Sequence, residues 1–180
     1  DSYIQTLQGS MARKDSMNMA LVMNLKGAIG DLSDGDINIK VEKGVVYVDI
    51  SDKLLFKSGS FSITDKATVV LGKVAKVLAA QPNIEFMVEG HTDSKQLLGS
   101  DNKMEDNWDL SVKRATTIVR LLQEKYGIDP KRMTAAGRGE YVPLAENNTP
   151  GNMAKNRRTK IIIMPKLNQF FDLLEQDASN

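Results

Sequence analysis

A strand and the loop that follows it lie in Ile84-Glu85-Phe86-Met87-Val88-Glu89-Gly90-His91-Thr92-Asp93. Apolar and polar side chains alternate as far as Gly90, which predicts a half-buried β-strand that delivers Asp93 to a loop. A helix is expected next, from about Asp109 to Tyr126, with an inward face of Leu110, Ala115, Ile118, Val119 and Leu122. In such a strand–loop–helix unit, the loop and the helix start lie at the same end of a sheet.

Further elements are predicted on both sides of this unit. A hairpin is expected at residues 37–50. An alternating run of apolar residues at 37–41 and a run rich in β-branched residues at 45–50 flank Glu42-Lys43-Gly44. Thr64 can cap a second helix, whose apolar face is Val70, Leu71, Val74, Val77 and Leu78. Residues 132–137 and 159–164 read as short strands, and residues 143–150 read as a loop. The expected order is therefore ββαβαββ.

The two ends of the chain carry weaker patterns. Residues 1–30 form a weakly amphipathic helix in which Lys14 and Asn18 interrupt the apolar stripe. Such a helix suits the end of a coiled-coil stalk, through which a homo-oligomer could form, and equally a helix lying on its own domain. The compact domain is expected at residues 36–165. A short helix or tail at residues 166–180 carries Phe170, Phe171 and Leu174, which need a docking surface.

Composition excludes several classes of protein. A chain of 180 residues suits one domain and an appendage, and its 24 basic and 23 acidic residues argue against a nucleic-acid binder. The absence of cysteine excludes disulfide scaffolds, Cys-ligated zinc and iron–sulfur clusters. No apolar stretch is long enough to span a bilayer. Because the chain begins at Asp1, we expect any leader or lipid anchor to be missing from it.

Asp93 and Arg114 are the strongest candidates for a binding site. The predicted elements bring this carboxylate and this guanidinium to one cleft. They fit a structural ion pair, which is the common fate of such residues. They also fit a receptor for a zwitterion, in which Asp93 takes an ammonium group and Arg114 grips a carboxylate.

Four motifs in order resemble a known family. They are Val88-Glu89-Gly90-His91-Thr92-Asp93, Asn107-Trp108-Asp109-Leu110-Ser111-Val112-Lys113-Arg114-Ala115, Gly137-Arg138-Gly139-Glu140 and Asn156-Arg157-Arg158-Thr159-Lys160-Ile161. They are similar to the peptidoglycan-binding domain shared by outer-membrane protein A (OmpA), the peptidoglycan-associated lipoprotein and the flagellar stator protein MotB. The resemblance covers about residues 45–164.

The resemblance implies a fold and a ligand. The fold would be an α/β (α+β) two-layer sandwich with a βαβαβ core and a mixed sheet. The ligand would be diaminopimelate in the stem peptide of peptidoglycan, bound without catalysis and without a cofactor. By this resemblance Asp93 would bind the ammonium group and Arg114 the carboxylate. The remaining implied contacts are Asn107, the backbone of Thr92, the walls Leu110 and Phe56, and either Arg157 or Arg158.

The resemblance also implies a location and partners. We expect a wall anchor at the periplasmic face of the outer membrane of a Gram-negative bacterium, attached through an N-terminal anchor. The alternative is a stator-like or secretion-system component that uses the same wall-binding domain. One departure from the family is Lys57, which stands directly after Phe56 where many relatives carry an acidic residue.

Other chemistries are weaker readings of the same residues. Glu89, His91 and Asp93 alternate along a strand and could offer a metal-binding face, which would suit a metal-assisted hydrolase. One histidine is few for such a site, and no Gly-x-Ser-x-Gly motif accompanies it, so catalysis and a metal are not expected. The basic run at residues 155–158 is expected to be a solvated face.

Overall fold

The computed structural model describes residues 1–30, 35–57, 60–96, 104–165 and 175. Its strands are β1 (Ile37–Glu42), β2 (Val45–Ser51), β3 (Ile84–His91), β4 (Met133–Gly137) and β5 (Arg158–Pro165). Its helices are α1 (Ser2–Ile29), α2 (Asp52–Leu55), α3 (Asp65–Ala79), α4 (Asn107–Glu124) and α5 (Pro150–Asn156), with a 3-10 turn at Pro130–Arg132. Within these residues, no helix has the length and apolar content needed to cross a membrane.

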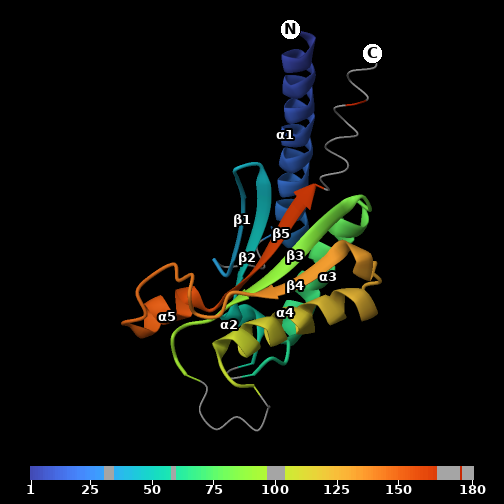
Figure 1. The fold of residues 1–180 in the computed structure, drawn as a ribbon. Coiled ribbons are helices and arrows are strands. Elements are labelled where there is room, and N and C mark those ends of the chain that lie inside the picture. Colours follow the sequence, from blue (N-terminus) through green and yellow to red (C-terminus); the bar gives the residue numbers. More distant parts are fainter. Residues whose placement is uncertain (31–34, 58–59, 97–103, 166–174, 176–180) are drawn as a thin grey trace.

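The strands form one mixed sheet in the order β1-β2-β5-β3-β4 (Figure 1). β5 comes last of these strands in the sequence, yet it lies between β2 and β3 and is antiparallel to both. β3 and β4 are parallel, which α4 makes possible as the crossover between them. The mixed sheet and the N-terminal helix are confirmed, and the predicted strands and longer helices occur in the predicted order.

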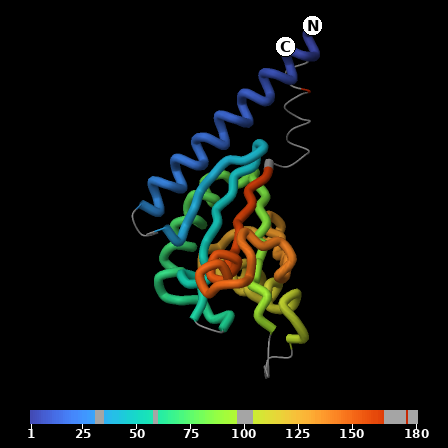
Figure 2. The backbone as a smooth tube through the Cα atoms, turned by 90° about the vertical axis from the view of Figure 1, so that its left-hand side faces the viewer, coloured from blue at the N-terminus to red at the C-terminus, as the bar shows by residue number. Residues whose placement is uncertain are grey.

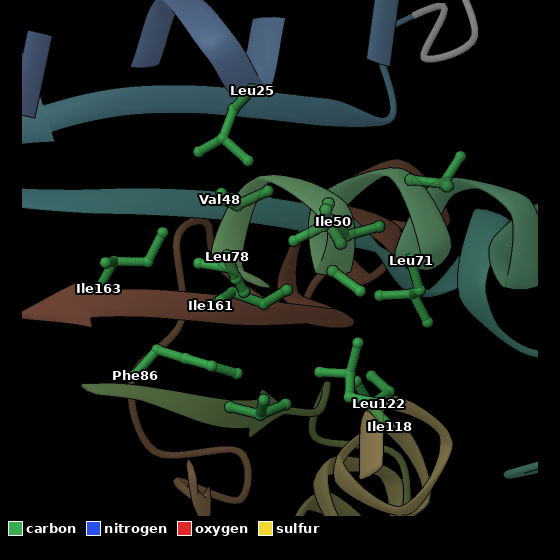
Figure 3. Packing of buried hydrophobic residues seen from close by; sticks show 14 of the residues in the cluster. Leu25, Val48, Ile50, Leu71, Leu78, Phe86, Ile118, Leu122, Ile161 and Ile163 are labelled. Atoms are coloured by element: carbon green, nitrogen blue, oxygen red, sulfur yellow. The ribbon is translucent and has the colours of Figure 1, made fainter. Parts of the chain in front are cut away.

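The hydrophobic core lies between one face of the sheet and the long helices. Side chains of the strands alternate between this face and the other, as the period of two requires. Figure 3 shows Val48, Ile161 and Phe86 from the sheet meeting Leu71 from α3 and Ile118 from α4. Figure 2 shows α1 and α3 on the same side of the strands. The structure is therefore a two-layer sandwich.

α1 packs on its own domain with its C-terminal half. Leu25 is fully buried there, and Ile29 is nearly so. Asn18, one of the two polar residues that interrupt the apolar stripe, donates from Nδ2 to the carbonyl of Gly44 at 2.9 Å. Lys43 and Gly44 form a two-residue hairpin turn with φ of 50° and 76°, as a type I′ turn requires. The polar residue Asn18 in the apolar stripe of α1 thus contacts a hairpin turn, whose backbone groups need hydrogen-bond partners.

Two short helices were missed by the sequence patterns. α2 occupies the segment after β2, and α5 follows the predicted loop, with Thr149 accepting a hydrogen bond from Asn152 N and Pro150 in its first turn. α4 begins at Asn107 rather than near Asp109, because Asp106 is its N-cap. The C-terminal segment with Phe170, Phe171 and Leu174, and residues 97–103 of the long loop, lie outside the described residues.

α4 approaches the sheet closely at two glycines. A Cβ atom on Gly90 of β3 would lie 2.2 Å from the carbonyl oxygen of Ser111, and one on Gly137 of β4 would lie 2.3 Å from Ser111 Oγ. Both distances are far inside van der Waals contact. Only glycine at these positions lets the N-terminal turns of α4 lie directly on the ends of β3 and β4.

We predict opposite effects for two glycine substitutions. Gly90→Ala should lower the free energy of unfolding by about 1–3 kcal/mol or more, because the backbone of α4 must shift. Gly27→Ala, in α1, has open space around its Cβ and should raise the free energy of unfolding by up to about 1 kcal/mol through helix propensity. Urea denaturation followed by circular dichroism measures both. Equal stabilities of the Gly90→Ala variant and the wild type would contradict the close packing.

Candidate binding cavity

A cavity of about 610 Å³ lies at the end of the sheet where β3 ends and β5 begins. Figure 1 shows α2, the start of α4 and α5 gathered around this end of the sheet. The residues that line it are Asp52, Lys53, Phe56, Lys57, Thr92, Asp93, Lys95, Gln96, Asn107, Leu110, Arg114, Ala154 and Arg157. The set includes Asp93, Arg114, Asn107, Thr92, Leu110 and Phe56, which the sequence singled out, so the structure brings these residues together.

Two ion pairs connect opposite walls of the cavity. Arg114 Nη1 donates to Asp52 Oδ2, and Arg157 Nη1 donates to Asp93 Oδ2 at 2.5 Å. Asp93 and Arg114 therefore share one cleft, but each is paired with a residue other than the one that sequence reasoning considered. A backbone bond from Asp52 N to the carbonyl of Arg157, 3.0 Å long, joins the two pairs. The two pairs place two acidic and two basic groups in one cavity.

Asp52 is the member of the two ion pairs that sequence reasoning missed. It follows the last residue of β2 and opens α2, and it is 6% exposed. The available signal was a serine before an acidic residue at a strand end, which is a typical helix start. Burial raises the pKa of the Asp52 carboxyl to about 6 although Arg114 and Arg157 act in the opposite direction, and nearby Asp93 adds to the increase.

The buried faces of Asp52 and Arg114 keep unused hydrogen-bonding capacity. Arg114 Nη2 donates to the carbonyl of Ser60 at 3.3 Å, and the guanidinium lies 5.1 Å from the centre of the Phe56 ring. Arg114 Nε and Asp52 Oδ1 are buried and have no hydrogen-bond partner among the described residues. Buried polar groups are normally satisfied, so this unpaired donor and this unpaired acceptor are exceptions within the buried ion pair.

Asn107 and Thr92 shape the loop that carries Asp93. Asn107 Nδ2 donates to the carbonyls of Asp93 at 3.2 Å and Lys95 at 3.1 Å, so its amide donors hold the loop. Thr92 N donates to the carbonyl of Gly139 at 2.9 Å, so this backbone N–H group is already in use. The backbone N–H group of Thr92 is therefore not free for a ligand.

The two arginines at the start of β5 have different environments. Arg157 lines the cavity, whereas Arg158 donates from Nη1 to the carbonyl of Asn156 and from Nη2 to that of Val142. Arg158 is 4% exposed, and its burial lowers the pKa of the guanidinium. The alternative that the sequence left open is thus resolved geometrically: Arg157, not Arg158, faces the cavity.

Glu89, His91 and Asp93 do not gather into one cluster. His91 Nε2 lies 2.7 Å from Glu89 Oε1, whereas the carboxylate of Asp93 bonds to Arg157 in the cavity. Burial lowers the pKa of the His91 imidazole, and the hydrogen bond with His91 lowers the pKa of Glu89. Neutral His91 then donates to an ionised Glu89. Among the described residues, no three acidic or histidine side chains are grouped as a metal site.

Three lysines surround the ion-paired floor of the cavity. Lys53, Lys57 and Lys95 line it with exposed side chains, and none has an ion-pair partner among the described residues. Each of the two ion pairs carries no net charge when its members are ionised. The three lysines therefore give the site a positive potential. Such a potential favours ligands that carry carboxylates.

We predict that Asp52 makes stability fall as pH rises. The folded state holds this proton more tightly than the unfolded state, whose carboxyl titrates near 3.8. The stability of the wild type relative to Asp52→Asn should fall from pH 4 to about pH 7 by up to about 3 kcal/mol, and then level off. Urea denaturation across this range measures the difference, with Asp15→Asn on exposed α1 as the control for loss of one charge. A pH-independent difference would contradict the buried carboxyl.

Comparisons with known proteins agree with this fold. The model of the OmpA family matches residues 55–157. Motility protein B of Bacillus subtilis (strain 168) is 32% identical over 130 residues, which are 72% of this chain and 49% of that protein. The crystal structure of a MotB-like protein from Desulfovibrio vulgaris has a TM-score of 0.77 at 24% identity and covers 87% of this chain and 96% of that one.

The cell wall anchor of the T6SS from Pseudomonas aeruginosa is a further structural neighbour. Its TM-score is 0.69 at 28% identity, covering 79% of this chain and 97% of that one. The chain spans about half the length of the first curated relatives that it matches. The family model covers more than half of the chain, including α3, β3, α4 and β4 and most of the cavity residues. The chain therefore belongs to the OmpA family.

Proposed function

We propose that this chain binds peptidoglycan noncatalytically by holding the free amino-acid end of diaminopimelate in the cavity. The observation that carries the proposal is the convergence of Asp93 and Arg114 on one cavity, each in an ion pair with a residue of opposite charge. Asp93 takes the ligand ammonium, and Arg114 takes the ligand carboxylate. Arg157 and Asp52 are the partners that the ligand displaces or joins.

Charge balance favours a zwitterion as the ligand. When all four groups are ionised, Asp52, Asp93, Arg114 and Arg157 carry no net charge, and an amino-acid end carries none either. When a zwitterion enters the cavity, its ammonium pairs with an acidic group and its carboxylate pairs with a basic group, and no charge is left unpaired. A ligand with only an ammonium or only a carboxylate would bury one uncompensated charge, which costs several kcal/mol.

The rim extends this recognition beyond the amino-acid end. Lys53, Lys57 and Lys95 are free to meet the other carboxylates of a stem peptide. These exposed contacts contribute mainly to the association rate and to salt dependence, whereas the buried pairs set specificity. The lysine at position 57, where an acidic residue was expected from the family pattern, thus suits an anionic peptide.

The chain is proposed to hold the wall rather than to cut it. His91 is the one histidine of the sequence, it is 2% exposed, and it does not line the cavity. Its Nε2 atom bonds to Glu89. His91 is therefore not placed to act as a general base on a ligand in the cavity.

Two settings remain for the proposed anchor. One is the outer membrane, reached through a lipid or other anchor outside this chain, at the periplasmic face. The other is a stator or secretion complex, and the likeness to motility protein B and to the cell wall anchor of the T6SS favours this second setting. In both settings wall binding by many copies multiplies a modest single-site affinity. A homo-oligomer through α1 stays a prediction.

We predict that binding needs both ends of the zwitterion. Isothermal titration should show binding of a stem peptide with diaminopimelate and at least tenfold weaker binding of the lysine-containing analogue, which lacks the second carboxylate. Asp93→Asn and Arg114→Gln should each weaken binding about 10- to 100-fold. Arg120→Gln, on the exposed face of the same helix as Arg114, is the matched control and should bind like the wild type.

Folding of each variant is checked by circular dichroism before titration. Equal affinity for the two peptides would show that the second carboxylate is not recognised. Failure of the wild type to bind either peptide would return the two ion pairs to a purely structural role.

A further inference from the structure

Trp108 and Tyr141 form an exposed aromatic pair beside the cavity. Their ring centres are 5.0 Å apart with planes inclined by 32°, and the residues are 47% and 61% exposed. Trp108 lies in the first turn of α4 next to Asn107, which lines the cavity, and Tyr141 lies in the loop after β4. Neither aromatic residue lines the cavity. Large aromatic side chains usually bury most of their surface, so an exposed pair indicates a contact surface.

The backbone beneath the pair is held in place. Gly139 has a φ of 58°, and a Cβ atom there would lie 3.3 Å from the Tyr141 ring and 3.4 Å from the Trp108 ring. Both rings therefore lie over this glycine. Gly139 N donates to Ser111 Oγ at 3.0 Å, and Ser111 Oγ donates to the carbonyl of Trp108 at 2.9 Å. The pair is preorganised, so little conformational entropy is lost when a ligand covers it.

One hydrogen bond joins this surface to the cavity. The carbonyl of Gly139 accepts the backbone N–H of Thr92, which lines the cavity. The aromatic pair and the floor of the cavity are thus built on neighbouring parts of the same backbone. The two rings therefore lie near the part of the cavity wall that Thr92 forms.

We propose that Trp108 and Tyr141 form a second subsite that stacks a sugar ring of the glycan strand. This inference rests on the proposed function, because the stem peptide is covalently attached to that strand. A pyranose offers an apolar C–H face to the rings, while the Trp N–H and the Tyr O–H suit its hydroxyl groups. Once the peptide occupies the cavity, the sugar binds at a high effective concentration. In this proposal the cavity binds the peptide, and the aromatic pair binds the sugar.

The experiment compares two ligands that differ only in the sugar. One is a stem peptide with diaminopimelate, and the other is the same peptide attached to its disaccharide. The disaccharide should improve the dissociation constant of the wild type about five- to tenfold. Tyr141→Ala and Trp108→Ala should lose this gain, and Trp108→Phe should retain part of it. Val142→Ala, at an exposed neighbouring site, is the matched control and should keep the gain.

Trp108 is the only tryptophan of the chain, so its fluorescence reports directly on this subsite. The emission should change with the disaccharide-bearing ligand and with millimolar disaccharide alone, and the change should be absent in Tyr141→Ala. Because stacking involves no charge, the gain from the sugar should survive 0.5 M salt, which weakens the lysine contacts.

Three outcomes would overturn the inference. They are equal affinity for the two ligands, unchanged fluorescence with the disaccharide, and a fluorescence change that the sugar-free peptide produces equally. The last outcome would assign the rings to the peptide. If the peptide does not bind at all, the proposed function fails, and the titration with disaccharide alone still decides whether the rings bind sugar.

Discussion

The cavity depends on the register of β5 with its two neighbours. Arg158 stands opposite Ser51 of β2 and opposite His91 of β3. The residues just beyond these positions are Asp52, Asp93 and Arg157, and the shared register brings all three to one end of the sheet. A slip of one residue would turn every side chain of β5 to the other face and separate the two ion pairs. The pairing of β5 with its neighbours thus also determines which charged groups line the cavity.

The fourth charged group reaches the cavity through a different contact. Arg114 is carried by α4, whose Ser111 lies against Gly90 and Gly137 at the ends of β3 and β4. Arg114 is three positions after Ser111, so both lie on the same face of the helix. The glycines therefore set the distance between the guanidinium and the cavity floor. Core packing and the ion pair with Asp52 hold Arg114 from two sides.

Local patterns predicted those parts of the molecule that local interactions determine. Alternation identified β3, runs of strand-forming residues identified β2 and β5, and Thr64 was predicted correctly as the cap of α3. Asp93 and Arg114 could be placed in one cleft because they belong to one strand–loop–helix unit. Asp52 could not be identified in this way, since its partner Arg114 is distant in the sequence and α2 is too short to show a period.

The choice between Arg157 and Arg158 shows the same limit. Adjacent residues at a strand start face opposite ways, and only the register with β2 and β3 decides which one turns to the cavity. Asn18 was a polar residue on an apolar stripe, which fitted a stalk as well as a packed helix. Its actual partner is a carbonyl in a hairpin turn that no helical pattern can reveal.

The hairpin turn and the cavity lie at opposite ends of β2. Gly44 touches α1 at one end, and Asp52 follows the other end. A pull applied between this turn and the cavity would act along β2, which pairs antiparallel with β5 (Figure 1). Inter-strand hydrogen bonds are perpendicular to that direction, so the load is spread over the whole ladder in shear instead of opening one bond at a time. The β2–β5 ladder would therefore resist such a pull better than a pull across the strands.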